Sequence, residues 1–223
     1  MPDGQYSFYL HSDDRTDIAA MATISTISQP LRGEFIRTAA TAGAVVYQVD
    51  ARLPALIPVF FAGQLSAVRL CAVMALVSGT WSSLTGLPDE PENGEAALPV
   101  SPETEYQRRR YTLTLQNGRS GERVESVLTE ASSRLRGDLL RNLIITGLAL
   151  HTTAPELPRL LASMPVPPTS VSELQALVQQ MAGTADVSRA AAAVPDTPAT
   201  SAVPVSGSDT REIKKNMRRA FGD

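Results

Sequence analysis

The segments YSFYLH at residues 6–11 and YTLTLQ at residues 111–116 decide the fold of this chain. In both segments, apolar side chains alternate with polar or mixed ones. The alternating apolar residues are Tyr6, Phe8, Leu10, Tyr111, Leu113 and Leu115. A period of two is typical of a β-strand that buries one face. Each segment therefore predicts a short strand whose other face is exposed to solvent.

The second segment repeats the first at a shift of 105 residues, and a longer match follows it. Between Leu31 and Leu56, a shift of 104 residues gives 8 identities in 26 aligned positions, among them the LRG triplets at residues 31–33 and 135–137. Self-similarity at a fixed spacing indicates a duplicated structural unit. We therefore expect two copies of one small domain.

The rest of the chain divides around these copies by composition. Residues 88–106 carry six acidic residues and no basic one, which sets the formal net charge of −3 and argues against a protein that coats nucleic acid indiscriminately. After Gly183 the chain is rich in Ala, Pro, Thr, Ser and Val without hydrophobic periodicity, as disordered tethers are. The predicted divisions are a first copy with a helical extension (1–86), an acidic linker (87–105), a second copy with its extension (106–183), a disordered tether (184–208) and an amphipathic peptide (209–223).

A helix of about three turns is predicted after each strand. Capping-type residues precede it, namely Ser12 and Asp13 in the first copy and Asn117 or Ser120 in the second. The predicted buried stripes of the two helices consist of Ile18, Met21, Ala22, Val124, Val127 and Leu128.

A longer second helix is predicted near residues 31–46 and near residues 135–150. Serine residues that can cap its start precede it in both copies, namely Ser28, Ser132 and Ser133. Gly43 and Gly147 lie inside these helices, where glycine costs about 1 kcal/mol relative to alanine. We therefore expect the two helices to cross closely at these glycines.

A strand followed by two helices leaves two backbone edges and one apolar face without partners. The predicted fold is therefore mainly α with a short two-stranded antiparallel ribbon. The strands of the two copies pair over their helices as a tandem ribbon-helix-helix pseudo-dimer, with extra helices and a disordered C-terminal tail. Pairing between two chains is the alternative. A two-stranded ribbon fits the major groove of DNA.

In that fold, the period of two fixes which strand side chains point outward. They are Ser7, Tyr9, His11, Arg110, Thr112, Thr114 and Gln116. Hydroxyl, amide, imidazole and guanidinium groups on one face suit hydrogen bonding to base edges. Because the two strands differ, they predict an asymmetric or imperfectly palindromic DNA site. An ordinary solvated strand face is the alternative interpretation.

The start of each second helix is the predicted phosphate-binding element. Helix N-terminal amides favour an anion, and here they are accompanied by Ser28 or Ser133 and by Arg32 and Arg136 in the first turns. The run Arg108-Arg109-Arg110 adds positive charge beside the second strand.

Composition argues against several other classes of protein. One cysteine and two histidines among 223 residues exclude an internal disulfide and a cysteine-based zinc site. Walker, dinucleotide-binding, HExxH and GxSxG motifs do not occur, so we expect no catalysis and no metal or cofactor. Residues 53–79 are apolar, but Pro58, Gln64 and Arg69 interrupt them, which favours a buried helical hairpin over a membrane span. No secretory signal opens the chain, and we expect a cytoplasmic protein.

The last fifteen residues combine an apolar stripe with basic residues. The stripe consists of Ile213, Met217 and either Ala220 or Phe221, and it is surrounded by Lys214, Lys215, Arg218 and Arg219. A helix this short is marginal alone, so we expect it to order on a partner protein.

Two parts of the chain resemble the ParR-type (StbB-like) adaptors of plasmid partition systems that use an actin-like motor. Residues 29–56 are similar to the family's second helix and the loop after it, through Arg37, Thr41, Ala42, Gly43, Tyr47, Asp50, Arg52 and Pro54. Residues 208–223 resemble the family's motor-binding peptide, through Lys214, Lys215, Asn216 and Met217.

The resemblance implies binding to repeated centromere-like plasmid DNA, self-association on that DNA and capture of a ParM-type actin-like filament. Repression of the operon's own promoter often accompanies these activities. The filament would be bound by the terminal peptide, through Ile213, Lys214, Lys215, Met217, Arg218 and Phe221. The known ParR-type adaptors carry one such domain per chain, whereas this chain carries two. His151, Ala154 and Glu156 replace Tyr47, Asp50 and Arg52 in the second copy, so we expect that copy to serve strand pairing more than recognition.

Two other functions compete with the partition adaptor. One is a ribbon-helix-helix transcriptional repressor or relaxosome accessory protein that recruits no motor. The other is an oligomeric scaffold that does not bind DNA. Loss of affinity with added salt separates a DNA-binding protein from a scaffold. Dependence of motor recruitment on the terminal peptide separates a partition adaptor from a repressor.

Overall fold

The computed structural model describes residues 4–80 and 108–192, with side chains described through residue 183. The chain divides into two compact units, residues 1–188 and 189–223. The architecture given below is that of the first unit. The predicted acidic linker, most of the predicted tether and the predicted terminal peptide lie outside the described residues.

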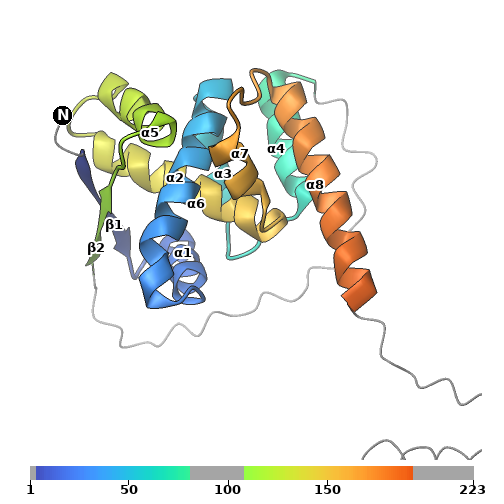
Figure 1. The fold of residues 1–223 in the computed structure, drawn as a ribbon, viewed down its shortest axis with the longest axis horizontal. Helices are drawn as coiled ribbons and strands as arrows, with labels where there is room; N and C mark the ends of the chain where they lie inside the picture. Colours follow the sequence, from blue (N-terminus) through green and yellow to red (C-terminus); the bar gives the residue numbers. More distant parts are fainter. Residues whose placement is uncertain (1–3, 81–107, 193–223) are drawn as a thin grey trace, which may run out of the picture. The chain divides into compact units, whose positions relative to one another are not determined.

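One strand from each repeat forms a two-stranded antiparallel ribbon (Figure 1). The strands are β1 (Gln5–His11) and β2 (Arg108–Thr114). The inward-facing side chains of Phe8, Leu10, Leu113 and Leu115 are buried. The predicted strands and their pairing within one chain are therefore confirmed, and of the predicted buried faces Tyr6 and Tyr111 are only partly buried.

The register of the ribbon reveals a pseudo-twofold axis between the repeats. Tyr6 pairs with Leu113 and Phe8 pairs with Tyr111, and a shift of 105 residues converts the first pair into the second. Ser7 and Thr112 are equivalent under the same shift, and they also pair with each other. The axis therefore passes through the Ser7–Thr112 pair. This self-complementary arrangement is the one that two identical units form in a symmetric dimer.

The helix after each strand forms where it was predicted, with a different cap. These helices are α1 (Arg15–Ser25) and α5 (Arg119–Glu130). The Asp14 carboxylate accepts the Asp17 N–H at 2.9 Å, so Asp14 caps α1 in place of the predicted Ser12 and Asp13. No side chain caps α5, which begins after Gly118, a residue whose φ of +137° favours glycine.

The buried face of α1 differs from the predicted stripe, whereas that of α5 matches it. Ala19, Ala20 and Ile24 are buried, Ile18 is partly buried and the predicted Ala22 is exposed. Because alanine occurs on several faces of α1, the hydrophobic pattern does not fix the rotation of this helix. In α5 the predicted residues are buried, namely Val124, Val127 and Leu128.

The second helices of the two repeats cross at the predicted glycines. A short 3₁₀ helix, η1 (Gln29–Leu31), leads into α2 (Arg32–Val49), and the equivalent of α2 is α6 (Arg136–Thr153). A Cβ added at Gly43 would lie 2.6 Å from the carbonyl carbon of Leu143, and one added at Gly147 would lie 2.6 Å from that of Ala39. Ordinary contacts begin at 3.4 Å. Each glycine therefore lets the backbone of the other helix approach, which confirms the predicted close crossing.

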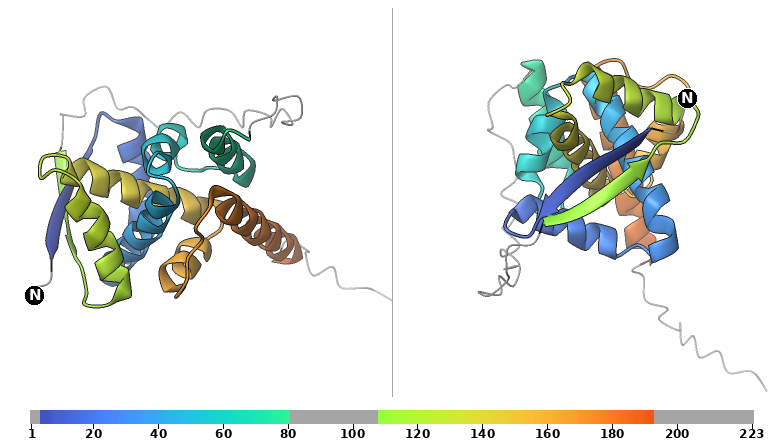
Figure 2. Two further views of the ribbon diagram at one scale, coloured as in Figure 1. Left: turned by 90° about the horizontal axis from the view of Figure 1, so that it is seen from above. Right: turned by 90° about the vertical axis from the view of Figure 1, so that its left-hand side faces the viewer.

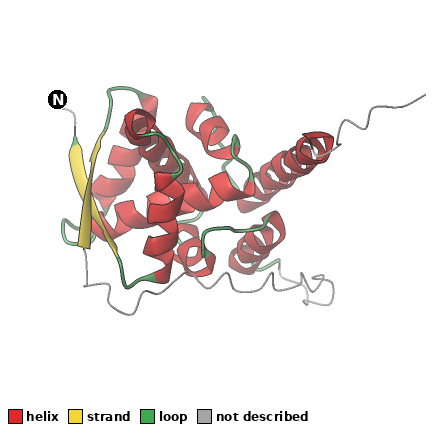
Figure 3. Ribbon diagram, turned by 90° about the horizontal axis from the view of Figure 1, so that it is seen from below, coloured by secondary structure: helices red, strands yellow, loops and turns green. Residues whose placement is uncertain are grey.

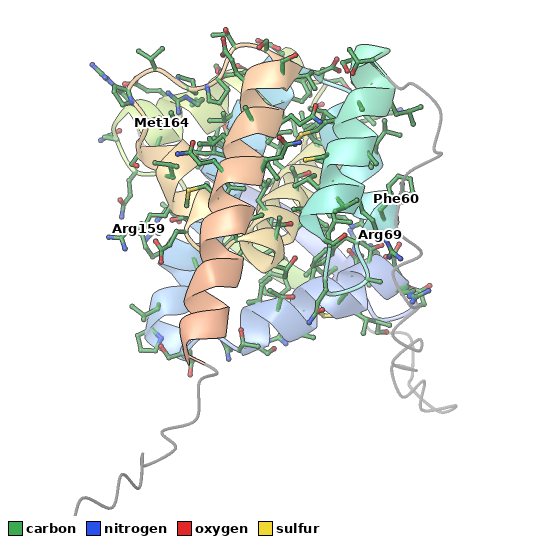
Figure 4. All side chains as sticks on the ribbon, turned by 90° about the vertical axis from the view of Figure 1, so that its right-hand side faces the viewer. Phe60, Arg69, Arg159 and Met164 are labelled. Carbon is green, nitrogen blue, oxygen red and sulfur yellow. The ribbon has the colours of Figure 1, made fainter. Side chains whose placement is uncertain are left out.

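The remaining helices lie beyond this crossing, away from the ribbon (Figures 1 and 3). They are α3 (Leu53–Phe60), α4 (Ala67–Ser78), α7 (Leu157–Ser163) and α8 (Val171–Ala192). Helix α8 continues through Ala192, beyond the Gly183 at which we expected it to end. Helices α4 and α8 lie side by side (Figure 4). Cys71 of α4 is buried there, and burial raises the pKa of its thiol. Within residues 4–80 and 108–192, no helix is long and apolar enough to cross a membrane.

Candidate nucleic-acid interface

The outer face of the ribbon is polar along its whole length. It faces the viewer in the right panel of Figure 2, with the helices behind it. Alternation with the buried residues assigns eight side chains to this face, namely Gln5, Ser7, Tyr9, His11, Arg108, Arg110, Thr112 and Thr114. The four from β2 are exposed, as is Gln5 of β1. Ser7, Tyr9 and His11 of β1 are partly exposed. The face thus offers hydroxyl, amide, imidazole and guanidinium groups.

Two guanidinium groups on this face are held in place by the opposite strand. Arg108 lies over the ring of Tyr9, with 3.5 Å between the guanidinium carbon and the ring centroid. Arg110 donates hydrogen bonds to Ser7 Oγ from Nη2 at 2.9 Å and from Nε at 3.2 Å. Cation–π and hydrogen-bonding contacts of this kind restrict long side chains that otherwise sample many rotamers. Both guanidinium groups are therefore oriented in the free protein.

Six of the seven predicted outward residues lie on the ribbon, and one does not. Gln116 is exposed but follows the end of β2, beside the start of α5. Gln5 and Arg108 also lie on the outer face. Neither was among the predicted outward residues, and Arg108 was predicted only as part of the basic run beside the strand. The signal that could have found them is the period of two, extended one step further along each strand.

A buried ion pair holds the His11 end of β1 against the second repeat. The Asp17 carboxylate is fully buried, and it accepts the His11 backbone N–H at 2.9 Å and Arg141 Nε of α6 at 2.6 Å. Arg141 Nη2 also reaches the Asp14 carboxylate at 3.3 Å. Burial raises the pKa of Asp17, and the hydrogen bond from Arg141 opposes the shift. Asp17 was not predicted, because its partner is 124 residues away in the sequence.

The starts of α2 and α6 lie beside the ribbon, but their predicted phosphate-binding side chains are arranged differently from the prediction. Arg32 Nε donates to the Ile27 carbonyl at 2.8 Å, and Arg136 Nε donates to the Ala131 carbonyl at 3.1 Å. Neither α2 nor α6 has a side-chain cap, so the predicted serine caps do not form, and Ser28 and Ser133 are exposed. Each arginine thus closes the turn before its helix in addition to placing a charge near the helix start.

Comparison with known proteins identifies the family of the chain. Residues 4–74 and residues 109–178 each match the plasmid stability protein family. The chain belongs to this family. The two matched segments contain the two strands and the helices that pack behind them, so this plasmid stability protein carries the family domain twice and has a role in plasmid maintenance. No curated protein and no solved structure is similar enough to register as a match.

The two repeats of this plasmid stability protein differ in how they hold the ribbon. Arg37, the equivalent of Arg141, pairs with Glu34 of its own helix at 2.7 Å. It has no partner equivalent to Asp17. A shift of 104 residues, which places the buried Ala20 and Ile24 of α1 on the buried Val124 and Leu128 of α5, places Gly121 at the position of Asp17. The buried ion pair therefore supports one end of the ribbon and not the other.

The Asp50-x-Arg52 part of the family-like motif is a structural clamp in the first repeat. Arg52 binds Asp50 through two hydrogen bonds of 3.0 and 2.8 Å and donates to the Val77 carbonyl at the end of α4, also at 2.8 Å. These hydrogen bonds lower the pKa of Asp50. The clamp connects the start of α3 to α4 and does not touch the ribbon. Its absence from the second repeat therefore says nothing about which repeat contributes to the outer face. The second strand supplies both guanidinium groups of that face, Arg108 and Arg110.

The predicted motor-binding residues lie outside the described part of the chain. They are Ile213, Lys214, Lys215, Met217, Arg218 and Phe221. They remain a prediction from the sequence.

Proposed function

We propose that this plasmid stability protein is a partition adaptor. In this proposal, the outer face of the ribbon binds centromere-like repeats of plasmid DNA, and the terminal peptide recruits an actin-like ATPase filament of the ParM type. Neighbouring chains associate on the repeated DNA in the cytoplasm. The protein itself performs no catalysis and needs no cofactor.

The composition of the ribbon's outer face is the observation that supports this proposal most strongly. A solvated strand face needs no particular chemistry, whereas this face concentrates the groups that hydrogen-bond to base edges. Two of those groups, Arg108 and Arg110, are already oriented by Tyr9 and Ser7. Helix starts beside the ribbon add backbone N–H groups of the kind that bind phosphate.

A salt titration of DNA binding tests the first half of the proposal. The full chain is titrated onto a fluorescent duplex that carries the upstream region of its own gene, and onto a scrambled duplex, between about 50 and 200 mM salt. If about six phosphates are contacted, the affinity should fall by roughly 10³-fold over this range. Affinity that does not change with salt would favour the scaffold and contradict the proposal.

Deletion of residues 211–223 tests the second half. The truncated chain should bind the duplex as the full chain does, but it should fail to co-sediment with filaments of an actin-like ATPase encoded beside its gene. Plasmid retention should fall with it. Unchanged retention, or the presence of a relaxase gene in place of the ATPase gene, would favour the repressor or accessory protein.

A further inference from the structure

We propose that the ribbon recognises a non-palindromic duplex with guanine in one half only, and that each chain therefore lies on DNA in a single orientation. This inference rests on the proposed DNA-binding function. It goes further by naming the kind of DNA site, which family membership does not specify.

The pseudo-twofold axis through Ser7 and Thr112 divides the outer face into two halves. The half toward the end of β1 contains Tyr9, His11, Arg108 and Arg110 and is called the basic half below. The half toward the start of β1 contains Gln5 and Thr114 and is called the neutral half. In a true dimer the halves would be identical. Here Arg110 is equivalent to Gln5, and Tyr9 is equivalent to Thr114.

Both guanidinium groups of the outer face belong to the basic half, and both lean toward the axis. Arg108 pairs with His11 but lies over Tyr9, which is one outward-facing pair closer to the axis. Arg110 pairs with Tyr9 but donates hydrogen bonds to Ser7, again one outward-facing pair closer to the axis. The forked donors are thus gathered beside the centre of the face on one side only.

The two halves therefore differ in the bases that they can recognise. Arginine binds the O6 and N7 acceptors of guanine through two hydrogen bonds, which is the commonest specific contact in the major groove. The amide of Gln5 matches adenine, and the methyl group of Thr114 matches that of thymine. Because Tyr9 and Ser7 already restrict the guanidinium groups, little conformational entropy is lost when guanine binds. We expect guanine under the basic half and A·T pairs under the neutral half.

Selection from a duplex library with a random central segment tests this inference on the full chain. The expected motif has guanine in one half and A·T pairs in the other. A motif with guanine in both halves would overturn the inference while leaving DNA binding intact. Failure to retain any duplex in a salt-dependent manner would overturn the proposed function itself, and the inference with it.

Two variants connect the asymmetry to named side chains. Arg108→Gln with Arg110→Gln should lower affinity for the selected motif by about 5- to 150-fold per guanine contact, and it should remove the preference for guanine. The control is Arg69→Gln, which removes an exposed charge of α4 away from the ribbon (Figure 4) and should leave the motif unchanged. An equal effect of Arg69→Gln would show a general charge effect and overturn the inference.

An exchange of equivalent positions provides the second variant. Gln5→Arg with Arg110→Gln keeps the composition and net charge but places one guanidinium group in each half. The selected motif should then contain guanine in both halves and become more nearly palindromic. A motif that stays unchanged would contradict the assignment of guanine to these arginines.

Discussion

Substitution of Gly43 by alanine tests the packing on which the ribbon depends. Gly43 lies where α2 crosses α6, and its new Cβ would be placed 2.6 Å from the Leu143 carbonyl carbon, against at least 3.4 Å in an ordinary contact. The Leu143 carbonyl oxygen lies nearer still, so the helices must move apart by more than about 0.8 Å, because the obstacle is backbone and cannot change rotamer.

The expected change in the free energy of unfolding is the sum of two opposing effects. Alanine gains about 1 kcal/mol over glycine inside a helix, through its helix propensity. Overpacking a core typically costs 1–3 kcal/mol, and a clash with backbone belongs near the upper end, at about 3 kcal/mol. The net result is a destabilisation of about 2 kcal/mol. For a chain of this size, that should lower the melting temperature by roughly 4–8 °C.

Thermal and urea unfolding followed by circular dichroism measure this change, and Gly33→Ala is the matched control. Gly33 lies in the same helix, but the nearest atom to a Cβ added there is Arg37 Nη1 at 3.9 Å. Gly33→Ala should therefore stabilise the protein by up to about 1 kcal/mol. If Gly43→Ala proved as stable as Gly33→Ala, the close crossing of α2 and α6 would be refuted.

Three further predictions concern Asp17, the outer face of the ribbon and the terminal peptide. Burial raises the pKa of Asp17, so the stability it contributes is greatest below its ordinary pKa of about 3.9 and falls as the pH rises to the raised value. In urea unfolding over a pH series, Asp17→Asn should remove that decline while its amide oxygen still accepts the His11 N–H, and an identical pH profile would contradict the assignment. Thr112→Ala with Thr114→Ala should relax sequence preference in competition binding, and an equal loss of affinity for cognate and random duplexes would count against base recognition. Met217→Glu should abolish co-sedimentation with the actin-like filament, because it places a charge on the apolar stripe of the peptide, and retention of the plasmid at the wild-type level would refute this role.

The parts of the fold that were predictable are those encoded by short-range patterns. The alternation of Tyr6, Phe8 and Leu10 identifies a strand and its buried face, and the internal repeat supplies its partner. Gly43 and Gly147 identify the helix crossing because glycine inside a helix needs a packing reason.

The parts that were not predictable depend on contacts between the repeats. Asp17 is buried because Arg141 of the other repeat reaches it, and no local pattern connects residues this far apart. Arg108 precedes the apolar alternation of its strand, and the ring that holds it belongs to Tyr9 of the other strand. The buried face of α1 was predicted incorrectly because its alanines occur on several faces of the helix, so the hydrophobic pattern does not identify one of them.

Photo-crosslinking from the ribbon tests most directly the central claim that its outer face meets duplex DNA. A benzophenone is attached to Thr112→Cys in a Cys71→Ala background, and the control carries it at Val68→Cys, an exposed position of α4 away from the ribbon (Figure 1). Illumination with a labelled plasmid duplex should crosslink the Thr112 position and leave the Val68 position free. Crosslinking from Val68 with none from Thr112 would contradict the account.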